Sequence, residues 1–306
     1  MSKIDNKYLN NLIENALKQP VKLILPEQSD LRVVDAKDEL SKMGFNILDI
    51  DDFSEDKLYF DCLKNKKFTN NWTDDMIVDF LSKPLNKGLV LLDLNIADCL
   101  VAGAVNSTSN VIKSTLRIIG LQNNVKWVSS CFFLVSPDCK NAYTYSDCGV
   151  IPDPDSEQLV SIAYKASNMH QLITGQDPRI AFLSFSTHGS ADHYKVKRVQ
   201  NAVKIFKEKY PDIIHDGELQ FDAAINPNVS QIKTPNSILN GNANTFIFPD
   251  LNSANIAYKI TQYLGGYSAW GPLLQGFNKP VHDLSRGCSV EDIISVSAIA
   301  AMQSIK

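Results

Sequence analysis

One stretch near the C-terminus organises the chain: Lys279-Pro280-Val281-His282-Asp283-Leu284-Ser285-Arg286-Gly287-Cys288-Ser289-Val290-Glu291-Asp292. Pro280 ends whatever element precedes it, and a short apolar run then leads into a polar loop. Ser289 is followed three residues later by Asp292 and then by a further apolar run, which is the pattern of a capped helix start. Ser285 and Arg286 therefore lie in a tight loop directly before a helix N-terminus.

This loop has two interpretations. The free N–H groups of a helix N-terminus carry partial positive charge, and an arginine beside them makes an anion site that suits a phosphate or an acyl phosphate. A serine followed three residues later by an acid is also an ordinary capping box, and a loop arginine is often only solvated or ion-paired. The spacing alone is compatible with both.

Composition bounds the class of protein. The chain has 306 residues, of which 44% are hydrophobic and 21% charged, as in a globular protein with one large domain or two ordinary ones. The formal net charge of -4 argues against a nucleic-acid-binding surface, although a local phosphate pocket remains compatible with it. No apolar run is long enough to span a bilayer, and residues 1–7 are polar with no signal core behind them. We therefore expect a cytoplasmic protein.

The cysteines show neither a C-x-x-C pair nor a metal-type spacing. We interpret all six as free thiols in a reducing compartment, namely Cys62, Cys99, Cys131, Cys139, Cys148 and Cys288. Cys288 lies inside the loop quoted above. It is either a nucleophile or a small residue buried in a tight loop, and no histidine neighbours it in sequence.

Strand-like and helix-like segments alternate along the chain. Residues 21–25, 30–43 and 45–50 predict a strand, a helix and a strand, which implies a parallel sheet covered by helices. Predicted strands at 97–105 and 180–185 each run into a hydroxyl-rich turn, and the second turn leads to a helix expected from residue 191. The acidic string at 216–222 is compatible with a strand and turn or with a surface hairpin, and 271–276 is expected to be a turn-rich crossing.

Phosphate recognition, if present, cannot use a standard glycine-rich loop. The chain has 14 glycines and contains neither G-x-G-x-x-G nor a P-loop string. Phosphate would have to be held by hydroxyl groups, helix N-termini and a few basic side chains.

Several strings, in one order along nearly the whole chain, resemble the phosphate acetyl/butyryltransferase family. They are LPE (25–27), AD (97–98) with VAGA (101–104), DCGV (147–150), LSFSTHGS (183–190), DGELQFDAA (216–224), FPDLN (248–252), GPLLQG (271–276) and DLSRG (283–287). The resemblance implies an α/β fold with two α/β/α lobes, mainly parallel sheets and an interdomain cleft, like that of isocitrate and isopropylmalate dehydrogenases. It implies a first lobe of residues 1–146 plus 278–306, completed by the C-terminal helix, and a second lobe of 147–277. A homodimer is also implied.

The implied activity is that of a phosphate acetyltransferase of acetate metabolism. Such an enzyme moves an acetyl group reversibly between coenzyme A and inorganic phosphate (acetyl-CoA + phosphate = CoA + acetyl phosphate), here by direct attack in a ternary complex. Coenzyme A or acetyl-CoA is then a substrate, and no cofactor is tightly bound. Alternatives are a phosphate butyryl- or propionyltransferase, and a weakly active binding relative.

Residue by residue, the resemblance places Ser285, Arg286 and Asp292 at the catalytic positions. We expect Asp292 to take the proton of the thiol, Arg286 to bind phosphate, and Ser285 to hold the carbonyl oxygen or phosphate. The expected substrate-binding residues are Ser107, Thr108, Lys113, Ser186, Thr187, Ser190 and Gly287, and no metal is expected.

The chain departs from the family at basic positions. Lys113 stands where the family usually has arginine, so that the charge is kept and the bidentate fork is lost. Arg117, one turn later, is a possible compensation. An arginine common upstream of residues 97–98 is absent, and Lys83 and Lys87 are the nearest basic residues.

Overall fold

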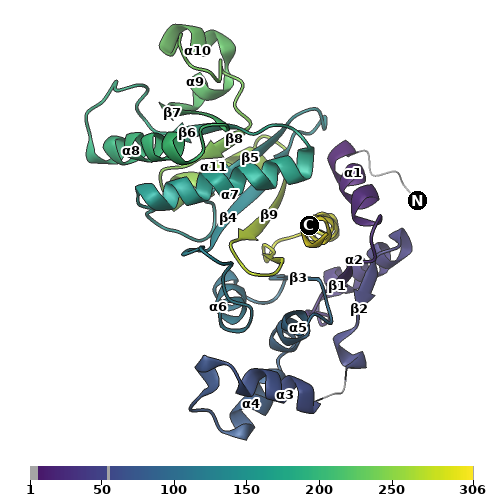
Figure 1. Ribbon diagram of the computed structural model, residues 1–306. Coiled ribbons are helices and arrows are strands. Elements are labelled where there is room, and N and C mark those ends of the chain that lie inside the picture. The colour runs from purple at the N-terminus through teal and green to yellow at the C-terminus, as the bar shows by residue number, and fades with distance from the viewer. Residues whose placement is uncertain (1–5, 54–55, 306) are drawn as a thin grey trace. The chain divides into compact units, whose positions relative to one another are not determined.

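The computed structural model describes residues 6–53 and 56–305 (Figure 1). The chain divides into two compact units, and we describe each by itself. The first unit comprises Met1–Lys126 and Gly271–Lys306, and the second comprises Trp127–Trp270.

The first unit is built on a sheet of four parallel strands in the order β10-β3-β1-β2. Its described elements, in chain order, are α1 (Lys7–Ala16), β1 (Lys22–Ile24), α2 (Leu31–Met43), β2 (Asn46–Leu48), η1 (Ile50–Asp52), α3 (Asp56–Lys64), η2 (Lys67–Thr69), α4 (Asp74–Leu81), α5 (Pro84–Asp93), β3 (Cys99–Ala102), α6 (Thr108–Ile118), β10 (Val281–Asp283) and α12 (Val290–Ser304). Helices α2 and α12 pack on one side of this sheet, and α5 and α6 on the other (Figure 1).

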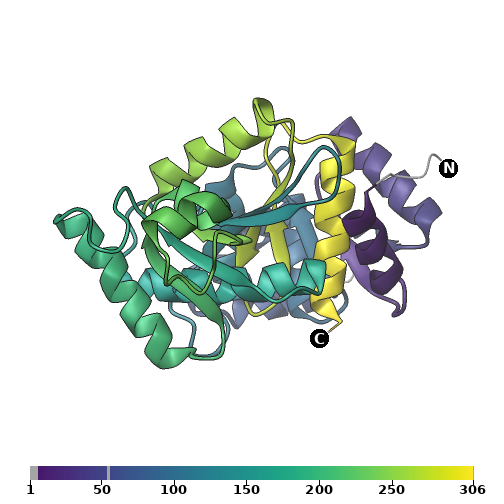
Figure 2. The same ribbon diagram turned by 90° about the horizontal axis from the view of Figure 1, so that it is seen from above.

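Helix α12 is the central helix of the first unit. It contacts β1, β3 and β10 on one side and α1 and α2 on the other, and Figure 2 shows it lying beside α1. Its residues from Ile293 to Ala301 are all buried, as expected of a helix covered on all sides. The helix begins with the predicted capping box, in which the Ser289 and Asp292 side chains each accept a backbone N–H of the other. The C-terminal stretch therefore completes the first unit.

The second unit contains a six-stranded sheet in the order β7-β6-β8-β5-β4-β9. Strands β4 and β5 are antiparallel, whereas β5, β6, β7 and β8 pair in parallel. The elements are β4 (Ser129–Val135), β5 (Ala142–Ser146), α7 (Ser156–Thr174), β6 (Arg179–Leu183), α8 (Tyr194–Lys209), β7 (Ile214–Leu219), α9 (Phe221–Ile225), α10 (Pro227–Lys233), β8 (Thr245–Ile247), α11 (Leu251–Tyr263) and β9 (Ser268–Gln275). The chain passes back to the first unit within β9.

Alternation along the strands gives this second sheet two apolar faces. In β6, Ile180 and Phe182 join a cluster with residues of α7 and α8, and Ala181 and Leu183 join a cluster with residues of α11. Successive side chains of a strand point to opposite faces, so a buried central strand needs an almost continuous apolar run. The run at 180–183 has this character.

The mainly parallel α/β architecture is confirmed, with local differences. The segment at 271–276 was expected to be a crossing, but it belongs to β9, which lies at the sheet edge where Pro272 is tolerated. The acidic string forms the parallel strand β7 and the start of α9, not a hairpin. Strands β4 and β5 belong to the second unit because β5 pairs with β8, whereas the lobes expected from the family resemblance placed both strands in the first lobe, before a boundary at 146. Helices α3, α9 and α10 were not predicted.

Gly103 sets how closely the ends of β3 and β10 approach. Its φ is +113°, and a Cβ atom there would lie 2.2 Å from Asp283 Oδ1 and 2.5 Å from the backbone nitrogen of Leu284. We expect Gly103→Ala to lower the free energy of unfolding by at least about 2 kcal/mol, because strain and overpacking add. Urea denaturation measures this change.

Gly120→Ala is the matched control. Gly120 also has a positive φ, of +76°, but no atom lies within 4 Å of the added methyl group. We expect Gly120→Ala to lower the free energy of unfolding by only about 1 kcal/mol, from backbone strain alone. Equal losses for the two variants would contradict the close approach at Gly103.

Candidate active site

The carboxyl ends of three neighbouring strands meet at one edge of the first unit's sheet. Strand β1 leads to Glu27, β3 leads to the loop at 103–107, and β10 leads to the loop at 284–288. Ligands of open α/β sheets bind at this edge, because the loops that follow parallel strands gather there. Four of the residues predicted to form the site lie in these loops, namely Ser107, Ser285, Arg286 and Gly287.

Glu27 organises the loop after β3. Its carboxylate is buried and accepts the backbone N–H groups of Gly103, Ala104 and Asn106 at 2.7–2.8 Å, and also the Asn106 side-chain amide at 2.7 Å. Four donors offset the cost of burying a carboxylate. The loop that leads into α6 is therefore held in one conformation.

Asp283 joins the end of β10 to the start of α6. Its side chain is 0% exposed, and its Oδ2 accepts a hydrogen bond of 2.5 Å from the hydroxyl of Thr108, the first residue of α6. Burial raises the pKa of Asp283 to about 7, and the Thr108 hydrogen bond offsets this only partly. Sequence reasoning gave Asp283 no role.

Arg32, in the first turn of α2, tethers the loop at 284–288. Its guanidinium donates to the carbonyl oxygens of Arg286 at 2.9 Å and Cys288 at 2.8 Å, and to that of Ala104 at 3.2 Å. Asp30, the N-cap residue of α2, accepts from the same guanidinium at 2.6 and 3.0 Å and fixes its orientation. Arg32 thus connects the loops that follow β3 and β10.

The tether leaves the polar part of the loop at the surface. Ser285, Arg286 and Gly287 are exposed, and the Gly287 N–H donates to the Ser285 hydroxyl at 3.3 Å. The Arg286 guanidinium makes no ion pair with any residue that the structure describes. Asp292 is partly exposed, and its Oδ2 accepts from the Ser289 backbone and hydroxyl at 2.9 Å. The structure therefore places Ser285, Arg286 and Gly287 in one exposed loop and Asp292 in the first turn of the helix that follows it.

Cys288 is a buried residue of this loop. Burial raises the pKa of its thiol to about 11, and Arg32 lowers it only in part. A thiol in that environment is mostly protonated at neutral pH and is a weak nucleophile. The structure favours the interpretation of Cys288 as a small packing residue.

A basic pocket lies beside α6. It has a volume of about 370 Å³, and three cationic side chains line it: Lys83, Lys113 and Arg117. The amides of Asn86, Asn106 and Asn110 also line it. The two basic residues of α6 and the lysine upstream of α5, all noted in the sequence, thus face one space.

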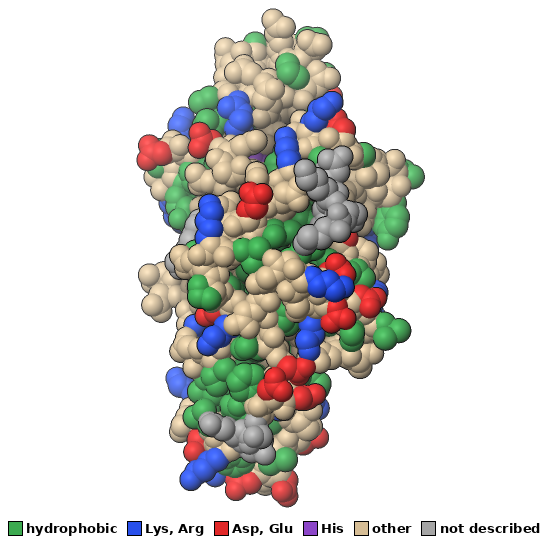
Figure 3. Space-filling model, turned by 90° about the vertical axis from the view of Figure 1, so that its right-hand side faces the viewer, with side chains coloured by type: hydrophobic (Ala, Val, Ile, Leu, Met, Phe, Trp, Pro, Cys, Tyr) green, Lys and Arg blue, Asp and Glu red, His purple; other side chains and the backbone are tan. Residues whose placement is uncertain are grey.

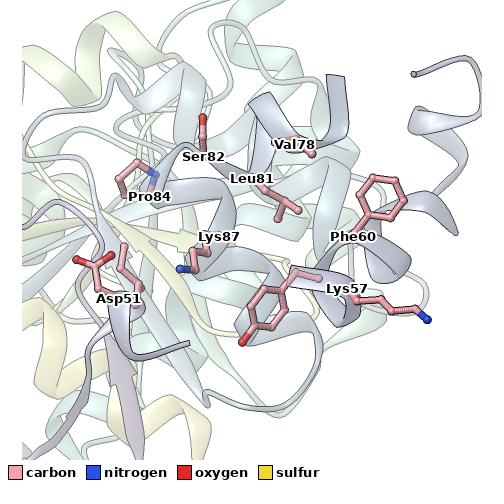
Figure 4. Close-up of a pocket in the computed structure, with 10 residues that line it drawn as sticks. Asp51, Lys57, Phe60, Val78, Leu81, Ser82, Pro84 and Lys87 are labelled. Atoms are coloured by element: carbon pink, nitrogen blue, oxygen red, sulfur yellow. The ribbon is translucent and has the colours of Figure 1, made fainter. Parts of the chain in front are cut away.

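A second, more apolar pocket of the first unit is formed by α3, α4, α5 and η1. Its volume is about 530 Å³, and Figure 4 shows Asp51 and Lys87 at one end and Phe60 at the other. Lys87 therefore faces a different space from Lys83.

The predicted hydroxyl residues of the second unit build a loop. Ser186 and Thr187 are buried, with the Ser186 hydroxyl donating to Glu218 at 2.8 Å and Thr187 Oγ1 accepting the Gln220 N–H at 2.9 Å. Ser190 is exposed and accepts the Thr187 N–H at 3.0 Å. Helix α8 begins at Tyr194, later than predicted, so this loop does not open a helix.

Glu218 anchors that loop. Burial acts to raise the pKa of Glu218, but hydrogen bonds from the Gly189 backbone and the Ser186 hydroxyl outweigh it, and the pKa lies below its ordinary value. The alternative that placed the acidic string at 216–222 in a surface hairpin is wrong for this residue, because Glu218 is buried.

Other kinds of site find little support. Within residues 6–53 and 56–305, no group of three or more His, Cys, Asp or Glu side chains is arranged to hold a metal ion. In the same described ranges, no helix is long and apolar enough to cross a membrane. On the face shown in Figure 3, acidic and basic side chains are interspersed.

We expect Arg32→Lys to loosen the loop at 284–288. Lysine keeps the charge but cannot donate to three carbonyl oxygens and Asp30 at once. Loss of one such hydrogen bond corresponds to about tenfold faster amide exchange at Gly287 and Cys288, measured by hydrogen–deuterium exchange. Lys42→Met, which removes an exposed ion pair with Glu39, is the control and should leave this exchange unchanged. Unchanged exchange in Arg32→Lys would contradict the tether.

Comparison with known proteins places the chain in a family. The family model described as phosphate acetyl/butaryl transferase matches residues 10–301. A phosphate acetyltransferase of Acetivibrio thermocellus is 38% identical over 324 residues, which cover 97% of this chain and 98% of the relative. One from Treponema pallidum is 44% identical over 228 residues, covering 72% and 68%. The crystal structure of a phosphotransacetylase from Streptococcus pyogenes superposes with a TM-score of 0.87 at 35% identity, covering 100% of this chain and 99% of that one. The chain therefore belongs to the phosphate acetyl/butyryl transferase family of acyltransferases.

Proposed function

We propose that this protein is a phosphate acetyltransferase. It transfers an acetyl group reversibly between coenzyme A and inorganic phosphate, by direct attack of one substrate on the other in a ternary complex. The observation that carries the proposal is the exposed loop Ser285-Arg286-Gly287, which Arg32 holds at the carboxyl edge of a parallel sheet. Relatives that match nearly all of the chain carry this activity in their names.

Arg286 is the anion-binding group of this proposal. Its guanidinium is exposed and makes no ion pair in the described part of the chain, so its donors are available to a phosphate. The Ser285 hydroxyl and the Gly287 N–H lie beside it and would hold the acetyl carbonyl oxygen or a phosphate oxygen.

Asp292 takes the proton of the coenzyme A thiol. Both hydrogen bonds that it accepts from Ser289 go to Oδ2, so Oδ1 is left for the substrate. The same side chain thus caps α12 and keeps one oxygen without a hydrogen bond to the described residues. The two interpretations of the sequence pattern are compatible with each other.

Further candidate substrate contacts lie within each unit taken by itself. In the first unit, Ser107 caps α6, Thr108 and Lys113 lie in its first two turns, and Lys113 lines the basic pocket, where a phosphate of either substrate would bind. In the second unit, Ser186 and Thr187 hold their loop in shape, and the exposed Ser190 is the residue of that loop left for a substrate contact.

The proposal includes no tightly bound cofactor and places the enzyme in cytoplasmic acetate metabolism. A propionyl- or butyryl-transferring enzyme is the nearest alternative, because one or two methylene groups change pocket preference by only about 1–3 kcal/mol. A weakly active binding relative is the other. The rate of thioester formation from acetyl, propionyl and butyryl phosphate with coenzyme A separates the three.

We expect the wild-type protein to form acetyl-CoA from acetyl phosphate and coenzyme A, followed by thioester absorbance. Asp292→Asn should lower kcat by about 10²–10⁴-fold, which is the usual contribution of a general base. Glu291→Gln removes an exposed acid one residue away and should stay within about threefold of wild type. A loss of less than about tenfold in Asp292→Asn would contradict the base role, and an inactive wild type would contradict the function.

We further propose that the protein is a homodimer that pairs through α11. Four exposed apolar side chains lie on one side of this helix and its C-cap: Ile256 (59% exposed), Ile260 (53%), Tyr263 (76%) and Leu264 (85%). A two-fold axis would pack this stripe against its own copy.

Ile260→Lys is expected to shift the protein toward monomer in sedimentation velocity, because it buries an unpaired charge in the interface. Ile232→Lys, at an 83% exposed position on α10, is the control and should leave the mass unchanged. A monomeric wild type, or a dimer insensitive to Ile260→Lys, would argue against this interface.

A further inference from the structure

Two carboxylates at the same edge of the first unit's sheet have opposite environments. Asp292 is partly exposed and begins a helix, whereas Asp283 is fully buried at the end of β10. Asp283 Oδ2 accepts from the Thr108 hydroxyl. Asp283 Oδ1 is buried and makes no well-aligned hydrogen bond to the described residues, and the nearby Leu284 backbone N–H lowers the pKa of this carboxyl only in part. A buried carboxylate oxygen without a partner is costly when ionised, so this geometry favours a carboxyl group that holds a proton.

The charged groups around Asp283 do not supply a compensating cation. From the end of β1, Glu27 acts to raise the pKa of Asp283, and the four donors that Glu27 accepts are directed to its own carboxylate. From α2, Arg32 is bonded to Asp30 and to backbone carbonyl oxygens. The adjacent His282 is fully buried, and burial lowers its pKa to about 4, so it is neutral at pH 7.

The remaining charged groups belong to α6, the loop after β10 and α12. Lys113 and Arg286 are exposed, and Asp292 is bonded to Ser289. Thr108 is therefore the side chain through which Asp283 connects to the partly exposed start of α6.

The proposed reaction requires a proton on its leaving group. When the thiol attacks acetyl phosphate, the bond between the acetyl carbon and the bridging oxygen breaks, and its electron pair goes to that oxygen. Phosphate expelled without a proton would be a trianion, which is a poor leaving group. The base Asp292 removes a proton from sulfur, but a second group must place one on phosphate.

We propose that Asp283 is the proton donor to the departing phosphate and that the Thr108 hydroxyl relays the proton. When Asp283 is protonated, its Oδ2–H donates to Thr108 Oγ1, which reverses the hydrogen bond seen in the structure and turns the Thr108 hydroxyl toward the bridging oxygen. The Asp283 proton then passes to Thr108 Oγ1 as the Thr108 hydroxyl proton passes to the bridging oxygen, and the phosphate leaves as HPO₄²⁻. Asp283 is left as a carboxylate. In the opposite direction, the carboxylate takes the proton back through Thr108 as HPO₄²⁻ attacks acetyl-CoA. This inference rests on the proposed function.

The location of Thr108 fits the phosphate side of the reaction. It begins α6 between Asn106 and Asn110, and both of these line the basic pocket with Lys113. A phosphate held in that pocket lies beside the first turn of α6. The pKa of about 7 for Asp283 also suits a group that donates in one direction and accepts in the other near neutral pH.

The test compares two acyl donors. The leaving group of acetyl phosphate needs a proton, whereas methyl acetyl phosphate expels methyl phosphate, whose second pKa near about 6 lets it leave as a stable dianion. We expect Asp283→Asn to lower kcat by about 10²–10³-fold with acetyl phosphate but by less than about fivefold with methyl acetyl phosphate. A purely structural role would lower both rates equally, and equal losses would overturn the proposal.

Thr108 provides a second pair of variants in case Asp283→Asn does not fold. Thr108→Val removes the hydroxyl at nearly constant shape and should show the same selective loss, and Thr108→Ser should recover most of it. Ser109→Ala, at an exposed neighbouring position, is the control for α6. Equal activities of Thr108→Val and Thr108→Ser would overturn the relay alone, whereas a wild type inactive with acetyl phosphate would overturn the proposed function and, with it, the proton donor.

Discussion

The buried carboxylate of Glu27 is the constraint on which the rest of the first unit's site depends. A buried carboxylate is tolerated only when charge-assisted hydrogen bonds replace its hydration. Here three backbone N–H groups of the loop after β3 and one amide side chain supply these bonds. This fixes the backbone after β3, and that backbone fixes where α6 begins. Gly103, which lies in the same loop, then allows β10 to end close by.

Arg32 extends this arrangement to the loop that carries Arg286. The Arg32 guanidinium is a planar fork, and Asp30 orients it so that its donors reach two loops that are far apart in sequence. The two arginines therefore have different tasks: Arg32 is bonded to protein, and Arg286 is left to solvent. An anion site made of backbone N–H groups works only if the backbone is already ordered, and Arg32 provides that order.

Local patterns in the sequence predicted many of the elements, though not α3, α9, α10 or β9, and they predicted the Ser289–Asp292 cap because a capping box depends on residues three apart. They could not predict Arg32 or Asp283, whose partners are remote in sequence and are brought near by strand pairing. Local sequence likewise does not reveal the remote partners of the hydroxyl-rich loop at 186–190 of the second unit. Its composition suggested a ligand contact, yet Ser186 and Thr187 turn inward to Glu218 and Gln220. A hydroxyl group that stabilises a loop is distinguished from one that can contact a substrate only by its burial in the folded structure.

The two aspartates of this site differ in environment and not in residue type, and their proposed roles follow from that difference. Asp283 ends β10 and Asp292 begins the next helix, and both would have the same pKa in an unfolded chain. Asp292 begins a helix and accepts two hydrogen bonds from Ser289, whereas Asp283 is enclosed with one oxygen unpaired. Pairs of carboxyl groups whose surroundings separate their proton affinities are how a single fold supplies both an acid and a base at one pH. The proposed acyl transfer moves one proton from sulfur to phosphate, and its proposed acid and base, Asp283 at the end of β10 and Asp292 at the start of α12, lie within ten residues of chain.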